Sequence, residues 1–470
     1  MSLPNTTLGA AAIGALLQKK KRLWFIGIGG IQMSALARAC LARGFAVGGS
    51  DTALSHTVKL LREEGIPVQI GHHPAALSDY DAAVYTLALS QEDPEYLAAV
   101  RLGLPVISRA DLLGYLTADF PRRIGVAGSH GKSTVTAMLG EIFAAAGRDP
   151  TVFCGAVMPN GSSARAGAGE TCIFEACEYG DSFLCLSPTT ALILNTEFDH
   201  ADYFPDHAAM LRSFADFAAL PTRAGRVIIE EKEENASAIL AKTVARVRTF
   251  GLLHGDCHAT EPEYAEGCGR FTPILDGKRC PPVSLRIPGA HNVKNALAAA
   301  LCALDEGISP AVVSAALSAF RGTARRMELR GHLQGARFFD DYAHHPTEIA
   351  AALAAAREIT AGTGRVFAVF QPHTYSRTRA LFADFCAALR AADRVIVADI
   401  YPARETDMQG MSAAGLADGI GAHAAYVGGL AQIARTLLAE IAPGDTVLVM
   451  GAGDIDRLFA EFCAKHFTLS

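Results

Sequence analysis

The chain has 470 residues, of which 50% are hydrophobic and 19% are charged. A single hydrophobic core rarely grows past roughly 250–300 residues, so this length predicts about three domains at roughly 150 residues each. The formal net charge of −6 excludes a general basic surface for a nucleic-acid backbone or an anionic membrane, and any anionic ligand must be held by local groups.

The amino-terminal segment, residues 1–20, is predicted to be a loosely held extension. Its charged run, Lys19 to Arg22, follows the apolar stretch instead of preceding it, which argues against a secretory signal. No window of the chain holds the roughly 18 uninterrupted apolar residues that a membrane helix needs. We therefore expect a cytoplasmic protein with no membrane insertion and no nucleic-acid partner.

Eleven cysteines are scattered between Cys40 and Cys463, without a CxxC pair or histidines at zinc spacing. This distribution predicts reduced thiols that serve as packing residues in a cytoplasmic protein.

Short β-branched and aromatic runs alternate with Ala- and Leu-rich helical stretches, which is typical of parallel sheets built from βαβ units. Nine strands are predicted, at residues 23–28, 82–88, 123–128, 171–176, 191–196, 226–230, 365–370, 394–400 and 446–451. Nine strands separated by helices exceed one domain. We expect boundaries near 117–121 and 322–331, and hence an α/β chain divided at 21–118, 119–325 and 326–470.

The first strand runs into GIGGIQMSALA, residues 27–37, and Asp51 follows at the distance where an acid that binds a ribose often lies. A nicotinamide coenzyme would fit such a turn, but the third glycine of the GxGxxG pattern is missing. A different phosphate-bearing ligand is favoured here, and a nicotinamide-dependent oxidoreductase stays an alternative.

The sequence GSHGKST, residues 128–134, lies between an apolar strand and a helical run. Backbone N–H groups in such a turn bind phosphate oxygens, Lys132 supplies a positive charge, and the Ser133 hydroxyl can bind Mg²⁺. The spacing departs from GxxxxGK[ST], so this is a variant phosphate-binding loop. A nucleotide triphosphate site is favoured over a chance glycine-lysine turn, and a noncatalytic nucleotide-binding regulator stays open.

Two further strand ends carry candidate metal and phosphate ligands, since Mg²⁺ prefers an octahedral shell of mostly oxygen atoms. Any one of these side chains taken alone could instead be a helix cap or a solvent-facing loop charge. The candidates are Glu175, Glu178, Glu197, Asp199, His200 and Asp202.

Ten segments together resemble the Mur ligase family, in order, over roughly residues 22–456. They are GIGGxxMS, GSHGKST, EACEYGDSF, NTEFDHADYF, GAHNVKNALAA (289–299), FRGTARRMELRG (320–331), DDYAHHPTE (340–348), FQPHTYSRTR (370–379), DIYPARE (399–405) and GAGDI (451–455). The resemblance implies a Rossmann-like N-terminal domain for a UDP-sugar, a central ATPase domain with the phosphate loop, and a Rossmann-like C-terminal domain for an amino acid.

The resemblance also implies the reaction. ATP and Mg²⁺ would convert the lactyl carboxylate of UDP-N-acetylmuramate to an acyl phosphate, which the amine of L-alanine attacks through a tetrahedral intermediate, in cytoplasmic peptidoglycan precursor synthesis. The loops FQPHTYSRTR and DIYPARE favour L-alanine. A related ligase that joins a whole recycled tripeptide to the same sugar nucleotide stays an alternative, as does either a monomer or a homodimer.

Carried over residue by residue, the resemblance implies four groups of site residues and a catalytic set. The groups are, for ATP, Gly128, Ser129, His130, Gly131, Lys132, Ser133, Thr134, Asn292, Asn295 and Arg326; for the UDP-sugar, Gly27, Gly29, Gly30, Met33, Ser34, Asp51 and Thr86; for the metal, Ser133, Glu175 and His200; and for the amino acid, Tyr342, His344, His373 and Arg377. The catalytic set is Lys132, His200, Glu175, His344 and Arg377.

Four positions depart from the family's usual residues. Ser129 and Ser133 replace threonines of the phosphate loop, which preserves the hydroxyl groups. Ser163 stands where the family often has an asparagine, which puts one substrate contact in question. Thr374 stands where relatives often have an arginine, so recognition of the amino-acid carboxylate would depend more on Arg377.

Overall fold

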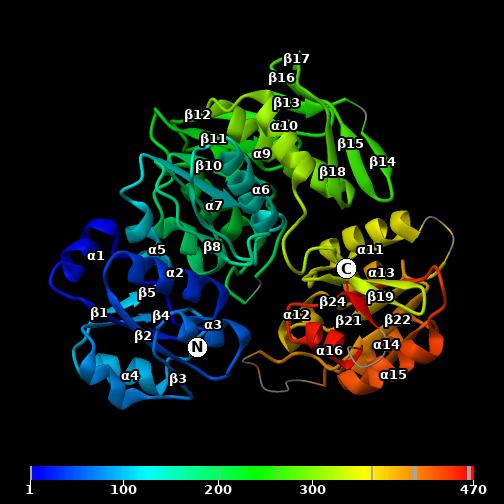
Figure 1. Cartoon of the computed structure of the whole chain (residues 1–470), viewed down its shortest axis with the longest axis horizontal. Coiled ribbons are helices and arrows are strands. Elements are labelled where there is room, and N and C mark those ends of the chain that lie inside the picture. Colours follow the sequence, from blue (N-terminus) through cyan, green and yellow to red (C-terminus); the bar gives the residue numbers. More distant parts are fainter. Residues whose placement is uncertain are drawn as a thin grey trace. The chain divides into compact units, whose positions relative to one another are not determined.

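The computed structural model describes residues 3–200, 202–260, 262–360, 362, 364–403, 405, 410–462 and 467–469. Contacts divide the chain into two compact units (Figure 1). The first comprises Met1–His258 and Ala298–Val313, and the second comprises Ala259–Leu297 and Ser314–Ser470. Among the described residues, no helix is both long and apolar enough to cross a membrane.

The first unit begins with a five-stranded parallel sheet in the order β3-β2-β1-β4-β5. Its strands are β1 (Arg22–Ile26), β2 (Ala46–Asp51), β3 (Val68–Ile70), β4 (Ala82–Tyr85) and β5 (Val106–Ser108). Its helices are α2 (Ile31–Ala42), α3 (His56–Glu63), η1 (Pro74–Asp79), α4 (Pro94–Arg101) and α5 (Arg109–Thr117). The strand order reverses between β1 and β4, and ligands of open α/β sheets bind in the crevice at such a switch point.

The part of the second sheet that belongs to this unit has the order β13-β12-β11-β10-β6-β9-β7-β8, and its strands are parallel except for the edge strand β8. Its strands are β6 (Arg122–Ala127), β7 (Thr151–Phe153), β8 (Ala164–Arg165), β9 (Thr171–Glu175), β10 (Thr190–Ile193), β11 (Arg226–Glu230), β12 (Arg246–Phe250) and β13 (Cys257–Ala259). Its helices are α6 (Lys132–Ala145), η2 (Tyr179–Cys185), α7 (His207–Ala218) and α8 (Ala236–Leu240). Two further helices, α9 (Ala290–Asp305) and α10 (Pro310–Ala319), contribute residues to both units.

The second unit contains an antiparallel sheet, a hairpin and a seven-stranded sheet in the order β23-β22-β21-β24-β20-β19-β25. The smaller elements are β14 (Glu263–Ala265), β15 (Cys268–Phe271), β18 (Val283–Pro288) and the hairpin β16 (Pro273–Leu275) with β17 (Lys278–Arg279). The large sheet comprises β19 (Glu328–Leu333), β20 (Ala336–Asp341), β21 (Val366–Phe370), β22 (Arg394–Ala398), β23 (Ala424–Gly428), β24 (Thr446–Met450) and β25 (Thr468–Leu469). The helices are α11 (Pro346–Thr360), α12 (Tyr375–Ala380), α13 (Phe382–Leu389), α14 (Ala413–Ile420), α15 (Leu430–Glu440), η3 (Ile455–Arg457) and α16 (Leu458–Phe462).

The interior strand β21 shows why this sheet is covered on both sides. Val366, Ala368 and Phe370 belong to one apolar cluster, and Phe367 and Val369 belong to another. Successive side chains of a strand point to opposite faces, so a continuous apolar run buries both faces of a parallel sheet.

All nine strands predicted from the sequence are confirmed, with ends shifted by a few residues. The strand β2, with the sequence AVGGSD, was not predicted because paired glycines are typical of turns. Here the two glycines are needed for close packing. An added Cβ would collide with the Tyr80 hydroxyl at Gly48, and with the Phe25 carbonyl oxygen at Gly49.

The prediction of a loosely held amino-terminal extension is wrong. Helix α1 (Ala10–Leu17) packs on α5, and Ile13 and Leu17 are buried in the same core as the first sheet. Ahead of the helix, Leu3 is only 3% exposed. The short apolar run is therefore a packing face, which periodicity over so few residues does not reveal.

No disulfide joins the ten described cysteines, and their burial is consistent with a packing role, while their reduced state stays a prediction. Six are buried, and Cys177, Cys185, Cys268 and Cys280 are partly buried. Cys463 lies outside the described residues.

Candidate functional site

The phosphate loop connects β6 to α6, as the sequence predicts. Gly131, at φ 85°, precedes the first helical residue, Lys132, and Gly128 has φ 139°. Both values lie in the region that favours glycine. The first N–H groups of α6 have no partner within the helix and lie at the positive end of the helix dipole, so this turn can bind an anion.

Glu178 lies at the centre of the charged cluster beside this loop. Its Oε1 atom lies 3.0 Å from Lys132 Nζ and 3.3 Å from His200 Nε2. Its side chain is 1% exposed, and its Oε2 atom is buried without a hydrogen-bond partner. His200 itself has φ 58°, a strained conformation for a residue other than glycine, which is common at functional sites.

Burial by itself would lower the pKa of Lys132, but the Glu178 carboxylate, with Cys177 and Glu175, raises it above the usual value. For Glu178, burial opposes ionisation, while Lys132 and His200 outweigh it and lower the pKa. Each partner therefore keeps the other charged.

Ser133 and Glu175 meet directly, as the predicted metal set requires. The Ser133 hydroxyl donates to Glu175 Oε2 at 2.7 Å, and the Gly155 N–H donates to the same oxygen at 2.8 Å. His200, the third member of that set, is connected to this loop through Glu178. The predicted set thus omitted Glu178, although the sequence marks it as a candidate at the same strand end.

The other acidic candidates hold the loop that carries His200. Asp199 Oδ1 accepts from the His200 N–H at 2.6 Å, and Asp202 Oδ2 accepts from the Tyr179 hydroxyl at 3.0 Å. Glu197 Oε2 lies 3.2 Å from His130 Nε2, which connects this loop to the phosphate loop. These three acids therefore form hydrogen bonds and ion pairs within and between loops. Such contacts fit the alternative that some of the acidic candidates are loop charges and not metal ligands.

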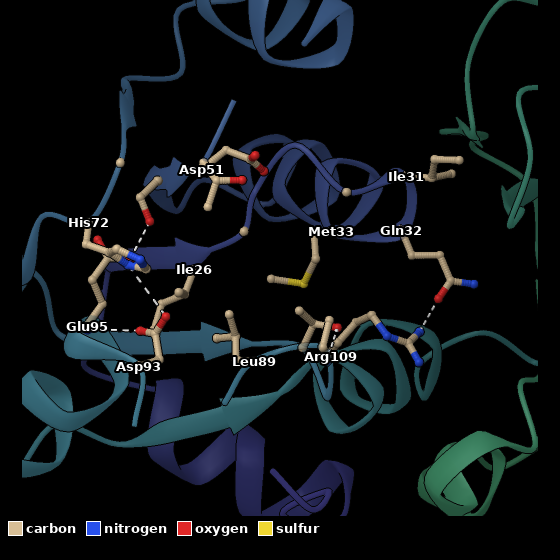
Figure 2. A pocket seen from close by; sticks show the side chains of 17 residues that line it. Ile26, Ile31, Gln32, Met33, Asp51, His72, Leu89, Asp93, Glu95 and Arg109 are labelled. Atoms are coloured by element: carbon tan, nitrogen blue, oxygen red, sulfur yellow. Dashed lines mark hydrogen bonds and ion pairs between the residues drawn. The ribbon is translucent and has the colours of Figure 1, made fainter. Parts of the chain in front are cut away.

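A cavity of about 400 Å³ lies at the switch point of the first sheet (Figure 2). Five of the seven predicted UDP-sugar residues line it, namely Gly27, Gly30, Met33, Asp51 and Thr86. The other two, Gly29 and Ser34, are not among the lining residues. The Gly29 N–H donates to Asp51 Oδ2 at 2.8 Å, and the Ser34 hydroxyl donates to the Ile31 carbonyl oxygen at 2.9 Å.

The opposite wall of the cavity carries polar residues that the motifs did not predict. Buried Glu95 accepts from the Ser50 hydroxyl at 2.5 Å and from the His73 N–H at 2.9 Å. Asp93 Oδ2 lies 3.6 Å from His72 Nδ1, and Arg109 donates to the Gln32 side chain (Figure 2). These residues come from β2, α2, the loop after β3, the N-terminal end of α4 and α5, so no local motif brings them together.

In the second unit, three of the predicted amino-acid residues form a row of rings. The Tyr342 and His344 ring centroids are 5.5 Å apart, and those of His344 and His373 are 6.1 Å apart. Tyr401 extends the row, with its ring 5.6 Å from that of His373. Arg377, the fourth predicted residue, lies on α12, where its N–H donates to Thr374 Oγ1.

Three further residues were predicted to bind ATP. Asn292 and Asn295 lie on α9, and Arg326 lies beside the row of rings. Asn295 donates to Asn292 Oδ1 at 3.0 Å, and Asn292 donates to the Pro288 carbonyl oxygen at 2.7 Å, so the two amides form a pair. The Arg326 guanidinium lies 5.4 Å from the centre of the Tyr342 ring and 3.5 Å from Glu348 Oε1.

Three family models match successive parts of the chain. They are described as "Mur ligase family, catalytic domain" at residues 22–121, "Mur ligase middle domain" at 126–303, and "Mur ligase, glutamate ligase domain" at 325–453. This chain belongs to the Mur ligase family. The match confirms the family that the ten sequence segments resemble, and the α/β fold with N-terminal, middle and C-terminal domains.

Whole-chain relatives agree with this assignment. The Mur ligase described here is 39% identical to the UDP-N-acetylmuramate--L-alanine ligase of Caldanaerobacter subterraneus subsp. tengcongensis, over 96% of this chain and 99% of that protein. The crystal structure of UDP-N-acetylmuramate-alanine ligase MurC from Thermotoga maritima has a TM-score of 0.82 at 27% identity, covering 95% and 99% of the two chains. The murein peptide ligase of Psychrobacter arcticus has the same fold, with a TM-score of 0.73 at 24% identity over 94% and 98%.

The donor set of this Mur ligase fits a hard divalent cation. Carboxylates and a hydroxyl from Ser133, Glu175 and Glu178 surround the start of α6, and the unpartnered Glu178 Oε2 offers a free lone pair. Oxygen atoms of this kind are the ligands that Mg²⁺ prefers. The residues present therefore fit Mg²⁺ bound together with nucleotide phosphates.

Proposed function

We propose that this Mur ligase joins L-alanine to the lactyl carboxylate of UDP-N-acetylmuramate, with cleavage of ATP to ADP and phosphate. The observation that carries the proposal is the Lys132–Glu178–His200 cluster, in which Glu178 is buried, at the phosphate loop of a chain that matches the alanine-ligase relative over nearly its whole length.

The reaction needs two bond exchanges. A carboxylate oxygen of the sugar nucleotide attacks the γ-phosphorus of ATP, ADP leaves, and an acyl phosphate results. The amine of L-alanine then attacks the acyl carbon, and the tetrahedral intermediate loses phosphate and a proton to leave an amide. Phosphorylation is required because a free carboxylate offers an amine only a very poor leaving group.

Phosphoryl transfer is mainly a problem of positioning and of stabilising negative charge. Lys132 supplies a fixed positive charge at the phosphate loop, and Glu178 orients its ammonium group at 3.0 Å. Ser133, Glu175 and Glu178 would hold Mg²⁺, with His200 beside them. When bound, the metal would neutralise charge on the phosphates. Asn292 and Asn295 are proposed to bind adenine, and Arg326 to reach toward the nucleotide.

The cavity of the first sheet is proposed to hold the UDP-sugar. The first N–H groups of α2, which follow its N-cap residue Gly30, would face the diphosphate, because a helix N-terminus favours anions. Asp51, held by the Gly29 N–H, would accept from the ribose hydroxyls.

The alanine substrate is proposed to bind at the row of rings in the second unit. Arg377 would bind its carboxylate, since a guanidinium can donate two parallel hydrogen bonds. Of the row, His344 and His373 can orient or accept a proton from the amine, and Tyr342 covers one side.

One rival shares this fold, a ligase that adds a whole recycled peptide to the same sugar nucleotide. Phosphate release with ATP, UDP-N-acetylmuramate and either L-alanine or the tripeptide decides between them. We expect release with L-alanine. Release with the tripeptide alone would refute the alanine assignment.

We further propose that the enzyme acts in the cytoplasm, where the ten described free thiols would stay reduced. A monomer and a homodimer would both fit the proposed reaction. Sedimentation of the purified chain with and without nucleotides would decide between them.

A further inference from the structure

The segment before α1 crosses from the first sheet to the second sheet of the first unit. On one side, the Tyr85 hydroxyl donates to the Pro4 carbonyl oxygen, and Thr6 bonds to Asp111. On the other side, Asn5 Nδ2 donates to the Gly180 carbonyl oxygen at 2.6 Å and lies 3.1 Å from Ser182 Oγ. The segment therefore attaches the domain of the first sheet, which contains the proposed nucleotide-sugar cavity, to the loop that follows β9.

The point of attachment is a strained turn. Gly180 and Asp181 have φ values of 63° and 55°, so both residues are left-handed inside η2. Asp181 is tied by its N–H to the Glu178 carbonyl oxygen at 3.0 Å and by its carboxylate to the Tyr203 hydroxyl at 2.7 Å. The backbone of Glu178 is thus part of the turn that Asn5 holds.

Leu87 contacts the same turn from the nucleotide-sugar side. A Cβ added at Gly180 would collide with Leu87 Cδ2, so the leucine packs directly on the glycine. Leu87 is 7% exposed, and its neighbours Thr86, Ala88 and Leu89 line the cavity of the first sheet. One short loop therefore contacts both the nucleotide-sugar cavity and the turn that carries Glu178.

We propose that Asn5 and Leu87 are positioning residues that hold Glu178 between Lys132 and His200, and that they couple occupancy of the nucleotide-sugar cavity to the geometry of the ATP site. The inference rests on the proposed function, because it assumes that the cavity binds the UDP-sugar and the phosphate loop binds ATP. A ligand that orders residues 86–89 would stabilise the turn through Leu87. The pre-ordered Glu178 would then bind Lys132 and the metal at a lower entropic cost.

The test measures binding, so it does not depend on turnover. The affinity for a nonhydrolysable ATP analogue with Mg²⁺ is measured by calorimetry with and without saturating UDP-N-acetylmuramate. We expect the sugar nucleotide to tighten analogue binding in the wild type by about 10-fold, within the usual range of coupling between sites. Without any tightening in the wild type, the coupling proposal would be wrong.

Two variants then test whether Asn5 and Leu87 carry the coupling between the nucleotide-sugar cavity and the ATP site. Asn5→Asp keeps the size of the side chain but removes the N–H donor, and Leu87→Ala removes the contact on Gly180. We expect both to reduce the coupling to nearly 1-fold and to lower kcat, with the KM for L-alanine unchanged. Leu87→Val removes only one methylene, so it is the variant expected to fold as the wild type does. It should show a partial loss of the coupling.

Leu8→Ala is the matched control, because Leu8 lies in the same segment and is 42% exposed. It should keep wild-type coupling. Wild-type coupling in folded Asn5→Asp and in Leu87→Val would overturn the proposal. If wild-type enzyme shows alanine-dependent phosphate release but no coupling, only this inference fails. If coupling is present without such release, the proposed function fails instead.

Discussion

Lys132 and Glu178 form a buried ion pair, with 3.0 Å between Nζ and Oε1 and with the carboxylate 1% exposed. Such a pair costs desolvation energy, which charge attraction and further hydrogen bonds must offset. Glu178 receives His200 as a second partner, and Lys132 donates to the Gly128 and Ser129 carbonyl oxygens. The pair therefore holds a positive charge at the phosphate loop in one orientation.

Replacement of Lys132 with alanine should abolish alanine-dependent phosphate release. We expect a loss of at least about 10²–10³ in kcat, the range found when one group that stabilises transition-state charge is removed. The change also leaves Glu178 buried without its cation, which should lower the free energy of unfolding by about 3–5 kcal/mol. The double variant K132A/E178Q is the control, since it should regain stability without activity. Substantial turnover by K132A would refute the assignment of the phosphate loop.

The magnesium requirement should depend on Glu175. In Glu175→Gln, one charged oxygen is lost beside Ser133, so we expect half-maximal activity at a Mg²⁺ concentration about 10–100-fold higher, comparable to known effects of residues around metal ligands. A Mg²⁺ titration of phosphate release measures this. Glu197→Gln, a change at a half-exposed acid that bonds His130, should leave the requirement near that of the wild type. Equal requirements in both variants would remove Glu175 from the metal set.

Gly29 has no space for a side chain. An added Cβ would lie 2.7 Å from both Asp51 Oδ2 and Val58 Cγ2. Gly29→Ala should therefore displace Asp51 and raise the KM for the UDP-sugar by about 10-fold, corresponding to about 1.4 kcal/mol, without change in the KM for ATP. Gly429→Ala is the matched control, because Gly429 has φ −70° and no atom within 4 Å of the added Cβ. A KM for the UDP-sugar that stays at the wild-type value would contradict the role of Asp51.

Arg377 and Arg379 lie on the same short helix, but Arg377 is half-buried and Arg379 is exposed. Arg377→Lys keeps the charge and loses the planar pair of donors, so the KM for L-alanine should rise about 10-fold or more. The KM values for ATP and the UDP-sugar should stay constant in the same steady-state measurements. Arg379→Lys should behave as the wild type. The opposite ranking of the two variants would shift carboxylate recognition to Arg379.

Asp340 should make stability depend on pH in the direction opposite to most acids. Burial raises the pKa of Asp340 to about 7, although Arg325 and Arg330 oppose the increase. The folded protein therefore binds a proton that the unfolded chain has released above about pH 4. The contribution of Asp340 to the free energy of unfolding is complete below about pH 4 and is lost as the pH rises through about 7.

Urea unfolding of the wild type and of Asp340→Asn, between pH 4.5 and 8, measures this dependence. The wild-type stability relative to the variant should decrease as the pH rises, because the amide mimics the protonated acid at every pH. If the stability of the wild type relative to Asp340→Asn instead increased as the pH rises, the two arginines would keep Asp340 ionised in the folded protein.

Much of the fold could be predicted from local sequence. The strands β6, β9 and β10 are contiguous apolar runs, and the phosphate loop lies within seven consecutive residues, so periodicity and glycine placement were sufficient to find them. The ends of these strands also marked Glu175, Glu178 and His200 as one group, since the carboxyl ends of parallel strands meet at one edge of a sheet.

Tertiary structure alone decided which of these groups meet. Local patterns encode neither the Lys132–Glu178 pair, separated by 46 positions, nor the Asn5–Gly180 bond, separated by 175, because such contacts form only when distant segments fold together. The same reason explains why Glu95 and Arg109 in the cavity wall, and the buried amino-terminal segment, were missed. The sequence by itself determined the strands, the phosphate loop and the family. Folding decided that Glu178, and not only Glu175, lies at the centre of the site.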